Sequence, residues 1–285
     1  MPTTPSGRTG QAAERATLAD GSVLAYQDTG GPGPVVVLAH GGTTDRRLWI
    51  HQVPVLASRF RVISYDWAGH GGSADPVGPH VRHEQLFQLL DGLGVDRAVL
   101  VGSSDGGKLA LDAALLHPER VDALVLVGSG MSGYQWPDSF LTLYRQRVHE
   151  VVGPEPRDLE TYVRATVEFL TAGPGRSRAD LAPEVWQLAL DMFRTITRRE
   201  WAGPQFAATD LDPPAVGRLD QVRVPVLVVH GTEDVPGIVE LSELLAGAVK
   251  GARHVVLPDA GHLPPLEHPE EFNQVLLEFL GTLPT

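Results

Sequence analysis

Short runs of consecutive apolar residues recur along the chain and alternate with longer stretches that repeat at helical spacing. The runs of strand length cover residues 35–39, 61–66, 98–102, 123–127, 225–230 and 252–257. Strands that are apolar on both faces are typical of a parallel sheet that helices cover on both sides. The pattern therefore predicts an α/β protein with a mostly parallel central sheet.

A hairpin and two helices complete this pattern in the first part of the chain. Residues 14–19 and 22–28 resemble two strands, and they meet at Asp20-Gly21, a favoured hairpin turn. Residues 80–93 and 105–117 place apolar side chains at helical spacing. We expect the helices to cover the sheet.

The alternation of strands and helices stops between residues 132 and 214, a stretch called the insertion below. Three segments there have apolar residues at helical spacing, with Pro- and Gly-rich joints between them. They lie near 138–152, 158–171 and 183–200. We expect the insertion to form a helical cap on a core domain made of residues 14–131 and 215–285.

The amino-acid composition indicates a globular α/β protein and argues against several kinds of partner and site. The 285 residues are 42% hydrophobic, which suffices for one large α/β domain with an insertion. A net charge of −12 opposes binding to nucleic acid and to anionic membrane surfaces. The absence of Cys excludes disulfides, Cys-ligated metals and Cys nucleophiles. The expected partner is a small-molecule substrate, and the sequence leaves the oligomeric state open.

The N-terminal residues 1–13 are polar and lack the apolar stretch of a signal peptide, so we expect a disordered tail. No apolar run approaches the ~18 residues that a membrane span needs. These features favour a cytoplasmic location.

The most informative motif is Gly102-Ser103-Ser104-Asp105-Gly106-Gly107, at the junction of a predicted strand and a predicted helix. A Ser with Gly two positions before and after it, on such a turn, forms a nucleophile elbow. The turn is so sharp that side chains larger than hydrogen clash at the two flanking positions. Ser104 has Gly102 and Gly106 there, which makes it the candidate nucleophile.

Two other interpretations of this motif stay open. Asp105 has Ser103 and Gly107 at its flanking positions, which is sterically tolerable. An Asp nucleophile would indicate dehalogenase or epoxide-hydrolase chemistry. The motif could also be an ordinary Gly-rich turn, because a five-residue pattern recurs by chance. The fit of the glycines favours Ser104.

A second Gly-rich turn, His40-Gly41-Gly42-Thr43, follows the predicted strand at 35–39. It comes at the same edge of a parallel sheet as the elbow. There the backbone N–H of Gly42 can bind a developing oxyanion together with the N–H of Asp105, which begins the predicted helix.

A Ser hydroxyl needs a base, and the base needs an orienting acid. The last two predicted strands end before suitable residues: Glu233 and Asp234 follow one, and His262 follows the other. His262 is the candidate base and Asp234 the candidate acid, with Glu233 as the competing carboxylate. The chain order Ser, Asp, His is the order expected of an α/β-hydrolase.

The chain resembles the α/β-hydrolase superfamily over about residues 14–283. Five motifs carry the resemblance: His40-Gly41-Gly42, Asp66-Trp67-Ala68-Gly69-His70-Gly71-Gly72-Ser73, the elbow, Gly231-Thr232-Glu233-Asp234, and Gly261-His262-Leu263-Pro264-Pro265-Leu266-Glu267-His268-Pro269.

This resemblance implies the α/β-hydrolase fold, with the insertion as the family's cap. It implies Ser104 as nucleophile, Asp234 as acid, His262 as base, and the N–H groups of Gly42 and Asp105 as the oxyanion hole. One departure concerns Asp105, because similar chains often have Met or another neutral residue after the nucleophile. A carboxylate beside an oxyanion hole disfavours negative charge there unless it points away or is paired.

These residues predict a serine hydrolase that cleaves an ester or lactone with an apolar body. Trp136, Tyr144 and Trp186 of the insertion, with Met131, are candidates for lining an apolar substrate pocket. The same aromatic residues could instead form the insertion's own small core.

Other functions remain compatible with the same residues. The triad could serve C–C bond hydrolysis, lyase chemistry or a cofactor-free peroxidase-like reaction, and a non-catalytic ligand-binding protein is a further alternative. No cofactor is expected. No metal is expected either, because no carboxylate pattern completes a site around His70, His80 and His83.

Overall fold

The computed structural model describes residues 13–152, 158–203, 206 and 208–284. This part of the chain forms an eight-stranded sheet in the order β1-β2-β4-β3-β5-β6-β7-β8. The strands are β1 (Glu14–Thr17), β2 (Val23–Asp28), β3 (Val35–Ala39), β4 (Arg61–Asp66), β5 (Ala98–Ser103), β6 (Val121–Val127), β7 (Val226–Gly231) and β8 (Arg253–Leu257). The strands from β4 to β8 pair in parallel, whereas β2 is antiparallel to both β1 and β4. The predicted mostly parallel sheet is confirmed.

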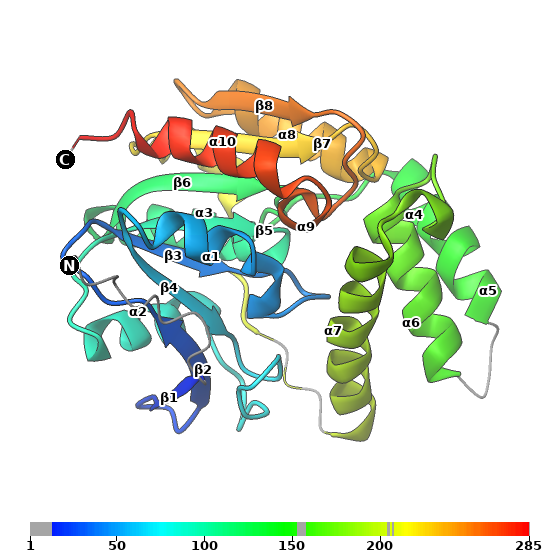
Figure 1. Ribbon diagram of the computed structural model, residues 1–285, viewed down its shortest axis with the longest axis horizontal. Coiled ribbons are helices and arrows are strands. Elements are labelled where there is room, and N and C mark those ends of the chain that lie inside the picture. The colour runs from blue at the N-terminus through cyan, green and yellow to red at the C-terminus, as the bar shows by residue number, and fades with distance from the viewer. Residues whose placement is uncertain (1–12, 153–157, 204–205, 207, 285) are drawn as a thin grey trace, which may run out of the picture.

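Helices cover both faces of this sheet (Figure 1). One face carries α2 (Arg82–Gly92), α3 (Asp105–Leu116) and α8 (Pro236–Ala248), and the other carries α1 (Gln52–Leu56) and α10 (Pro269–Leu280). In β5, Leu100 belongs to the cluster under α3, whereas Val99 and Val101 belong to the cluster under α10. Successive side chains of the strand are therefore buried in opposite layers, which explains why the central strands are apolar on both faces.

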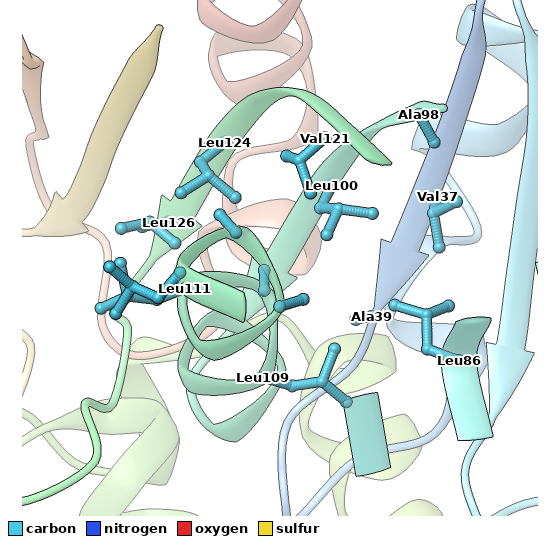
Figure 2. Packing of buried hydrophobic residues seen from close by; sticks show 14 of the residues in the cluster. Val37, Ala39, Leu86, Ala98, Leu100, Leu109, Leu111, Val121, Leu124 and Leu126 are labelled. Carbon is cyan, nitrogen blue, oxygen red and sulfur yellow. The ribbon is translucent and has the colours of Figure 1, made fainter. Parts of the chain in front are cut away.

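The layer under α3 fixes the helix that follows the elbow. Leu109 and Leu111 of α3 belong to one buried cluster with Leu100 of β5 and Leu124 and Leu126 of β6, and Figure 2 shows these residues around α3. All five side chains are buried. This packing holds the N-terminal end of α3 at the carboxyl edge of the sheet.

The insertion contributes α4 (Asp138–Tyr144), α5 (Glu150–Val152), α6 (Leu159–Val167) and α7 (Pro183–Ala202). In Figure 1 these helices lie together, beyond the end of the sheet toward which β3 and β7 point. The helices expected near 138–152 and 158–171 are not regular over their length. They change to π-helical turns at Arg145–His149 and Glu168–Ala172. That the insertion acts as a separate cap domain stays a prediction.

One buried carboxylate holds both ends of the insertion. The hydroxyl of Ser132 donates to Oδ1 of Asp112 in α3 (2.7 Å) and accepts from the backbone N–H of Ala215 (2.9 Å). The N–H of Val216 donates to the carbonyl oxygen of Ser132 (3.2 Å). Burial raises the pKa of Asp112 to about 6. The chain thus leaves and re-enters the core at one point on α3.

Two expectations concern the N-terminal part of the chain. The predicted tail of residues 1–13 lies outside the described residues except for Ala13. Strand β1 ends at Thr17, two residues earlier than expected, because the N–H of Leu18 bonds the carbonyl oxygen of Ser22 in the turn. Within the described ranges, none of the helices is long and apolar enough to cross a membrane.

Candidate active site

Ser104 occupies a strained backbone position between β5 and α3. Its φ of 54° and ψ of −119° lie where residues other than Gly are rare, at a cost of about 1–3 kcal/mol. A Cβ at Gly102 would overlap the backbone of Gly106, and a Cβ at Gly106 would overlap the carbonyl oxygen of Ala39. The two glycines therefore permit the turn, and the structure places Ser104 rather than Asp105 at its tip.

Asp234 and His262 meet in the loops that follow β7 and β8. Nδ1 of His262 lies 3.0 Å from both carboxylate oxygens of Asp234, and both side chains are buried. Glu233, the competing carboxylate, is partly exposed and accepts from the hydroxyl of Thr232 (3.3 Å). Because a carboxylate only accepts, Nδ1 carries the proton, and Nε2 is left to accept one.

Gly128 connects this pair to the elbow. The N–H of Ser104 donates to the carbonyl oxygen of Val127 (2.9 Å), the residue before Gly128. A Cβ at Gly128 would lie 3.1 Å from Oδ2 of Asp234 and 3.1 Å from Nδ1 of His262. The end of β6 is thus bonded to Ser104, and the next residue, Gly128, packs against the Asp234–His262 pair, so the three residues predicted as a triad gather around this point.

The charges around His262 set its protonation. Burial by itself lowers the pKa of His262, but the charge of Asp234 and its hydrogen bond outweigh burial and raise the pKa above its ordinary value. Glu267 and Asp105 add to the increase. The imidazolium that forms when His262 takes a proton is therefore stabilised.

The Gly-rich turn after β3 lies against the elbow. A Cβ at Gly41 would lie 3.1 Å from Cβ of Ser104, and a Cβ at Gly42 would lie 2.7 Å from Oδ2 of Asp105. The N–H of Asp105 stands at the N-terminus of α3, the positive end of the helix dipole. This arrangement suits a group that develops negative charge beside Ser104.

A family model described as "alpha/beta hydrolase fold" matches residues 34–269. The chain belongs to the α/β-hydrolase family. It is an α/β-fold hydrolase, as its named relatives are, and the resemblance stated from the sequence is confirmed.

The relatives of this hydrolase cleave different bonds. A 2-hydroxy-6-oxononadienedioate/2-hydroxy-6-oxononatrienedioate hydrolase of Paraburkholderia phymatum is 31% identical over 272 residues, which cover 90% of this chain and 90% of that protein. A pimeloyl-[acyl-carrier protein] methyl ester esterase of Nitrosomonas europaea is 30% identical over 256 residues, covering 86% and 95%. The crystal structure of the enol-lactonase from Burkholderia xenovorans LB400 matches with a TM-score of 0.70 and 27% identity, covering 94% of this chain and 100% of that one.

Two buried histidines that the sequence analysis did not place in the site support the Gly-rich turn of the hydrolase. Nδ1 of His40 donates to the carbonyl oxygen of Gly41 (2.8 Å), and its Nε2 accepts from the N–H of Trp67 (3.3 Å). Nε2 of His70 lies 3.1 Å from the carbonyl oxygen of Gly42. Burial lowers the pKa of His40 to about 4, so its ring is neutral, as these two bonds require.

Asp105 has a cationic neighbour from α2. Nη1 of Arg82 lies 3.9 Å from Oδ2 of Asp105, and its guanidinium stacks 4.1 Å above the ring of Trp67. The side chain of Asp105 is 46% exposed, so this pair is open to water. The carboxylate beside the proposed oxyanion site is thus paired only loosely.

The four candidate pocket residues lie in packed surroundings. Met131 is buried in the layer under α3, and Trp186 is 4% exposed in the layer that includes β3 and α10. Tyr144 and Trp136 pack with Phe140, at centroid distances of 6.3 Å and 4.9 Å. Trp136 is the partly exposed tryptophan of the candidate set, so it is the better probe of a pocket role. That role stays a prediction.

The histidines weighed as metal ligands have other surroundings. The two ring nitrogens of His70 lie 3.2 Å and 3.1 Å from the carbonyl oxygens of Ala68 and Gly42, and Nδ1 of His80 lies 3.2 Å from the carbonyl oxygen of Gly78. Among the residues that the structure describes, no three His, Asp or Glu side chains are grouped to hold a metal ion.

Proposed function

We propose that the protein is a serine hydrolase that cleaves a carboxylic ester or lactone through an acyl-enzyme on Ser104. The observation that carries this proposal is the strained elbow at Ser104 beside the hydrogen-bonded Asp234–His262 pair. Strain at one backbone position persists only where the surroundings demand it, and it clusters at functional sites.

In the proposed reaction, Oγ of Ser104 attacks the ester carbonyl while Nε2 of His262 takes its proton. The N–H groups of Gly42 and Asp105 bind the resulting oxyanion. His262 then returns the proton to the leaving alkoxide, and an acyl group remains on Ser104. Water then attacks this acyl-enzyme while His262 takes its proton. The acid leaves as the bond to Oγ breaks, and His262 returns the proton to Oγ of Ser104.

The relatives support an ester or lactone as the substrate class. A methyl ester esterase and an enol-lactonase both cleave a carbonyl–oxygen bond, by their names. The negative charge of the chain, −12, disfavours nucleic acid as a partner and agrees with a small neutral substrate.

The similarity to the Paraburkholderia phymatum enzyme favours C–C bond hydrolysis as the second candidate function. The same nucleophile and oxyanion site would then accept a ketone carbonyl instead of an ester carbonyl. The carbanion that leaves in this reaction needs a proton, which His262 could return.

A serine-directed fluorophosphonate probe tests the nucleophile. We expect labelling of the wild type and of Asp105→Asn, and no labelling of Ser104→Ala. If Ser104→Ala were labelled, another residue would be the nucleophile. The same conclusion would follow if Ser104→Ala turned over esters while Asp105→Asn was inactive. Turnover of p-nitrophenyl esters and lactones, compared with β-diketones, separates the two candidate reactions.

A further inference from the structure

The loop that carries His262 is organised by one buried carboxylate. Glu267 in α9 (Pro264–Glu267) accepts the N–H of Gly261 (3.0 and 3.1 Å) and the N–H of Leu263 (3.1 Å). These are the residues directly before and after His262. The side chain of Glu267 is 3% exposed, so it has little access to water.

The cation that balances this carboxylate comes from the insertion. Nη2 of Arg176 lies 2.7 Å from Oε2 of Glu267. Nη1 of Arg176 donates to the carbonyl oxygen of Asp259 (2.5 Å), a residue held at φ 58° in the same loop. Its Nε donates to the carbonyl oxygen of Ala172 (2.8 Å), within the insertion. Arg176 thus bonds the insertion and the His262 loop at once.

The backbone around Arg176 fits closely against both loops of the Asp234–His262 pair. A Cβ at Gly261 would lie 2.7 Å from Nη2 of Arg176 and would overlap the carbonyl oxygen of Thr171. A Cβ at Gly173 would overlap the carbonyl group of Glu233, the residue before Asp234. The segment 171–176 is therefore in contact with the acid loop and the base loop, with no room for movement of either toward it.

We propose that Arg176 and Glu267 are positioning residues, which hold the His262 loop and make the insertion part of the catalytic geometry. The proposal rests on the proposed function, because it treats His262 as the base. Neither residue touches the reacting atoms. Glu267 fixes the backbone on both sides of His262, and Arg176 keeps Glu267 in place.

Removing one partner of a buried ion pair leaves the other charge uncompensated, and the structure around it relaxes. In Arg176→Gln, Glu267 loses the cation that holds it, so its hydrogen bonds to the N–H groups of Gly261 and Leu263 loosen. A displacement of the base by about 1 Å lowers kcat by roughly 10²-fold. Because the loop acts on the base and not on substrate contacts, KM is expected to change by less than about threefold.

The pH profile separates positioning from a general loss of folding. Asp234, Glu267 and Asp105 are the charges that raise the pKa of His262. The acid limb is the part of the pH profile in which kcat/KM falls at low pH because His262 becomes protonated. Glu267→Gln removes one of these charges, so the acid limb shifts to lower pH. Arg176→Gln removes none of these carboxylates, so it shifts the acid limb less than Glu267→Gln does. A merely structural defect would lower activity in both variants without this difference between their acid limbs.

The matched control is Arg194→Gln. Arg194 lies in α7, also in the insertion, and its guanidinium pairs with Glu160 (Nε to Oε1, 2.7 Å). This pair has the same length as the Arg176–Glu267 pair and lies within the insertion. We expect kcat of Arg194→Gln to stay within about twofold of the wild type, since the pair is half-exposed. Arg176→Lys, which keeps the charge, is expected to recover part of the lost kcat.

The experiment measures kcat, KM and the acid limb for the variants of Arg176 and Glu267, together with the downfield proton NMR signal of His262 Nδ1–H. The proposal is supported if kcat falls at least tenfold in Arg176→Gln and the loss in the double variant with Glu267→Gln is less than additive. It also requires that the Nδ1–H signal broadens in Arg176→Gln and stays unchanged in Arg194→Gln. An unchanged kcat and an unchanged signal in Arg176→Gln would overturn the proposal.

The two proposals can fail separately. The Nδ1–H signal reports the Asp234–His262 geometry without any substrate, so it tests the positioning role even if no ester is turned over. A wild type that neither reacts with a fluorophosphonate nor hydrolyses esters would overturn the proposed function, and a signal sensitive to Arg176 would still assign the positioning.

Discussion

His262 is buried beside the charges of Asp234, Glu267 and Asp105, and these raise its pKa. A general base must be neutral, so activity falls as pH drops through this raised pKa, above the ordinary value of about 6.5. The same shift has the opposite sign for stability. The interaction of protonated His262 with these carboxylates stabilises the fold fully below about pH 6.5. This stabilisation is lost as pH rises through the raised pKa of His262.

Replacing Asp234 by Asn tests whether the charge of Asp234 raises the pKa of His262. Asp234→Asn removes the main cause of the increase, so the acid limb of kcat/KM moves to lower pH, and kcat falls because the ring loses its orientation. The measurement is kcat/KM from about pH 5 to 9 for both proteins. A wild type with no acid limb would contradict the role of His262.

Gly102 carries a second prediction at this scale. A Cβ there would lie 2.5 Å from the backbone N of Gly107 and would overlap the carbonyl oxygen of Gly106. Gly102→Ala should therefore lower the free energy of unfolding by about 3 kcal/mol and remove activity. Gly92→Ala is the control, because nothing lies within 4 Å of a Cβ at Gly92. Chemical denaturation of both variants measures the difference, and equal stabilities would contradict the steric account of the elbow.

At the scale of elements, α3 does more than present the elbow. Its Asp112 holds Ser132 and, through the Ser132 hydroxyl, Ala215, so the two ends of the insertion are attached to one helix. The carboxylate is 4% exposed, and burial keeps its pKa at about 6. Its charged neighbours are Lys108 and Arg218, which lower the pKa, and Asp210, which raises it.

This burial predicts how stability depends on pH. The folded state binds the proton of Asp112 more tightly than the unfolded chain does, so this group contributes stability at low pH that is lost as pH rises to about 6. Asp112→Asn keeps an acceptor for Ser132 and removes the charge. At pH 7 it should raise the free energy of unfolding by about 1–3 kcal/mol, and at pH 4 by much less. The exposed Asp96→Asn serves as control, and a variant no more stable than the wild type at pH 7 would contradict this prediction.

At the scale of the whole molecule, the insertion packs against the loops that carry Asp234 and His262, and we predict that it sets the size of the substrate. Trp136 packs against Phe140 at 4.9 Å, and a Cβ at Gly237, three residues after Asp234, would lie 3.2 Å from its ring. Trp136 therefore connects the insertion to the first turn of α8, which follows the acid loop. Trp186 is less informative, because truncating so buried a side chain costs about 3–5 kcal/mol in stability.

If Trp136 lines the pocket, the protein prefers longer acyl groups. Each buried CH₂ contributes about 0.8 kcal/mol, so four extra carbons change kcat/KM by roughly 10²-fold. Trp136→Ala should reduce the ratio of kcat/KM for hexanoyl and acetyl esters about tenfold, whereas Trp201→Ala, on the exposed side of α7, should leave it unchanged. If Trp136→Ala lost stability and kept the ratio, the aromatic residues would be the insertion's own core.

Local sterics and periodicity let much of the molecule be predicted from the sequence. The six runs all became strands of the sheet. Five of them are buried on both faces, whereas β8 lies at the edge of the sheet with Arg253, His254 and Val256 exposed. The elbow was recognisable because its requirement for Gly acts over five adjacent residues, from Gly102 to Gly106. The chain-terminal helix α10 went unnamed, although Phe272, Leu276 and Phe279 have helical spacing that could have revealed it.

Contacts between distant parts of the chain were decided only by the tertiary structure. Arg176 and Glu267 are 91 residues apart, and nothing local to either marks it as a partner of the other. The same holds for Arg82 beside Asp105 and for His40 and His70 behind the Gly-rich turn. The sequence by itself thus determined which residues carry the candidate chemistry, because turns and periodic patterns are short-range. Folding decided which charges and carbonyl groups surround them, because those neighbours are brought together only when the sheet and the insertion pack.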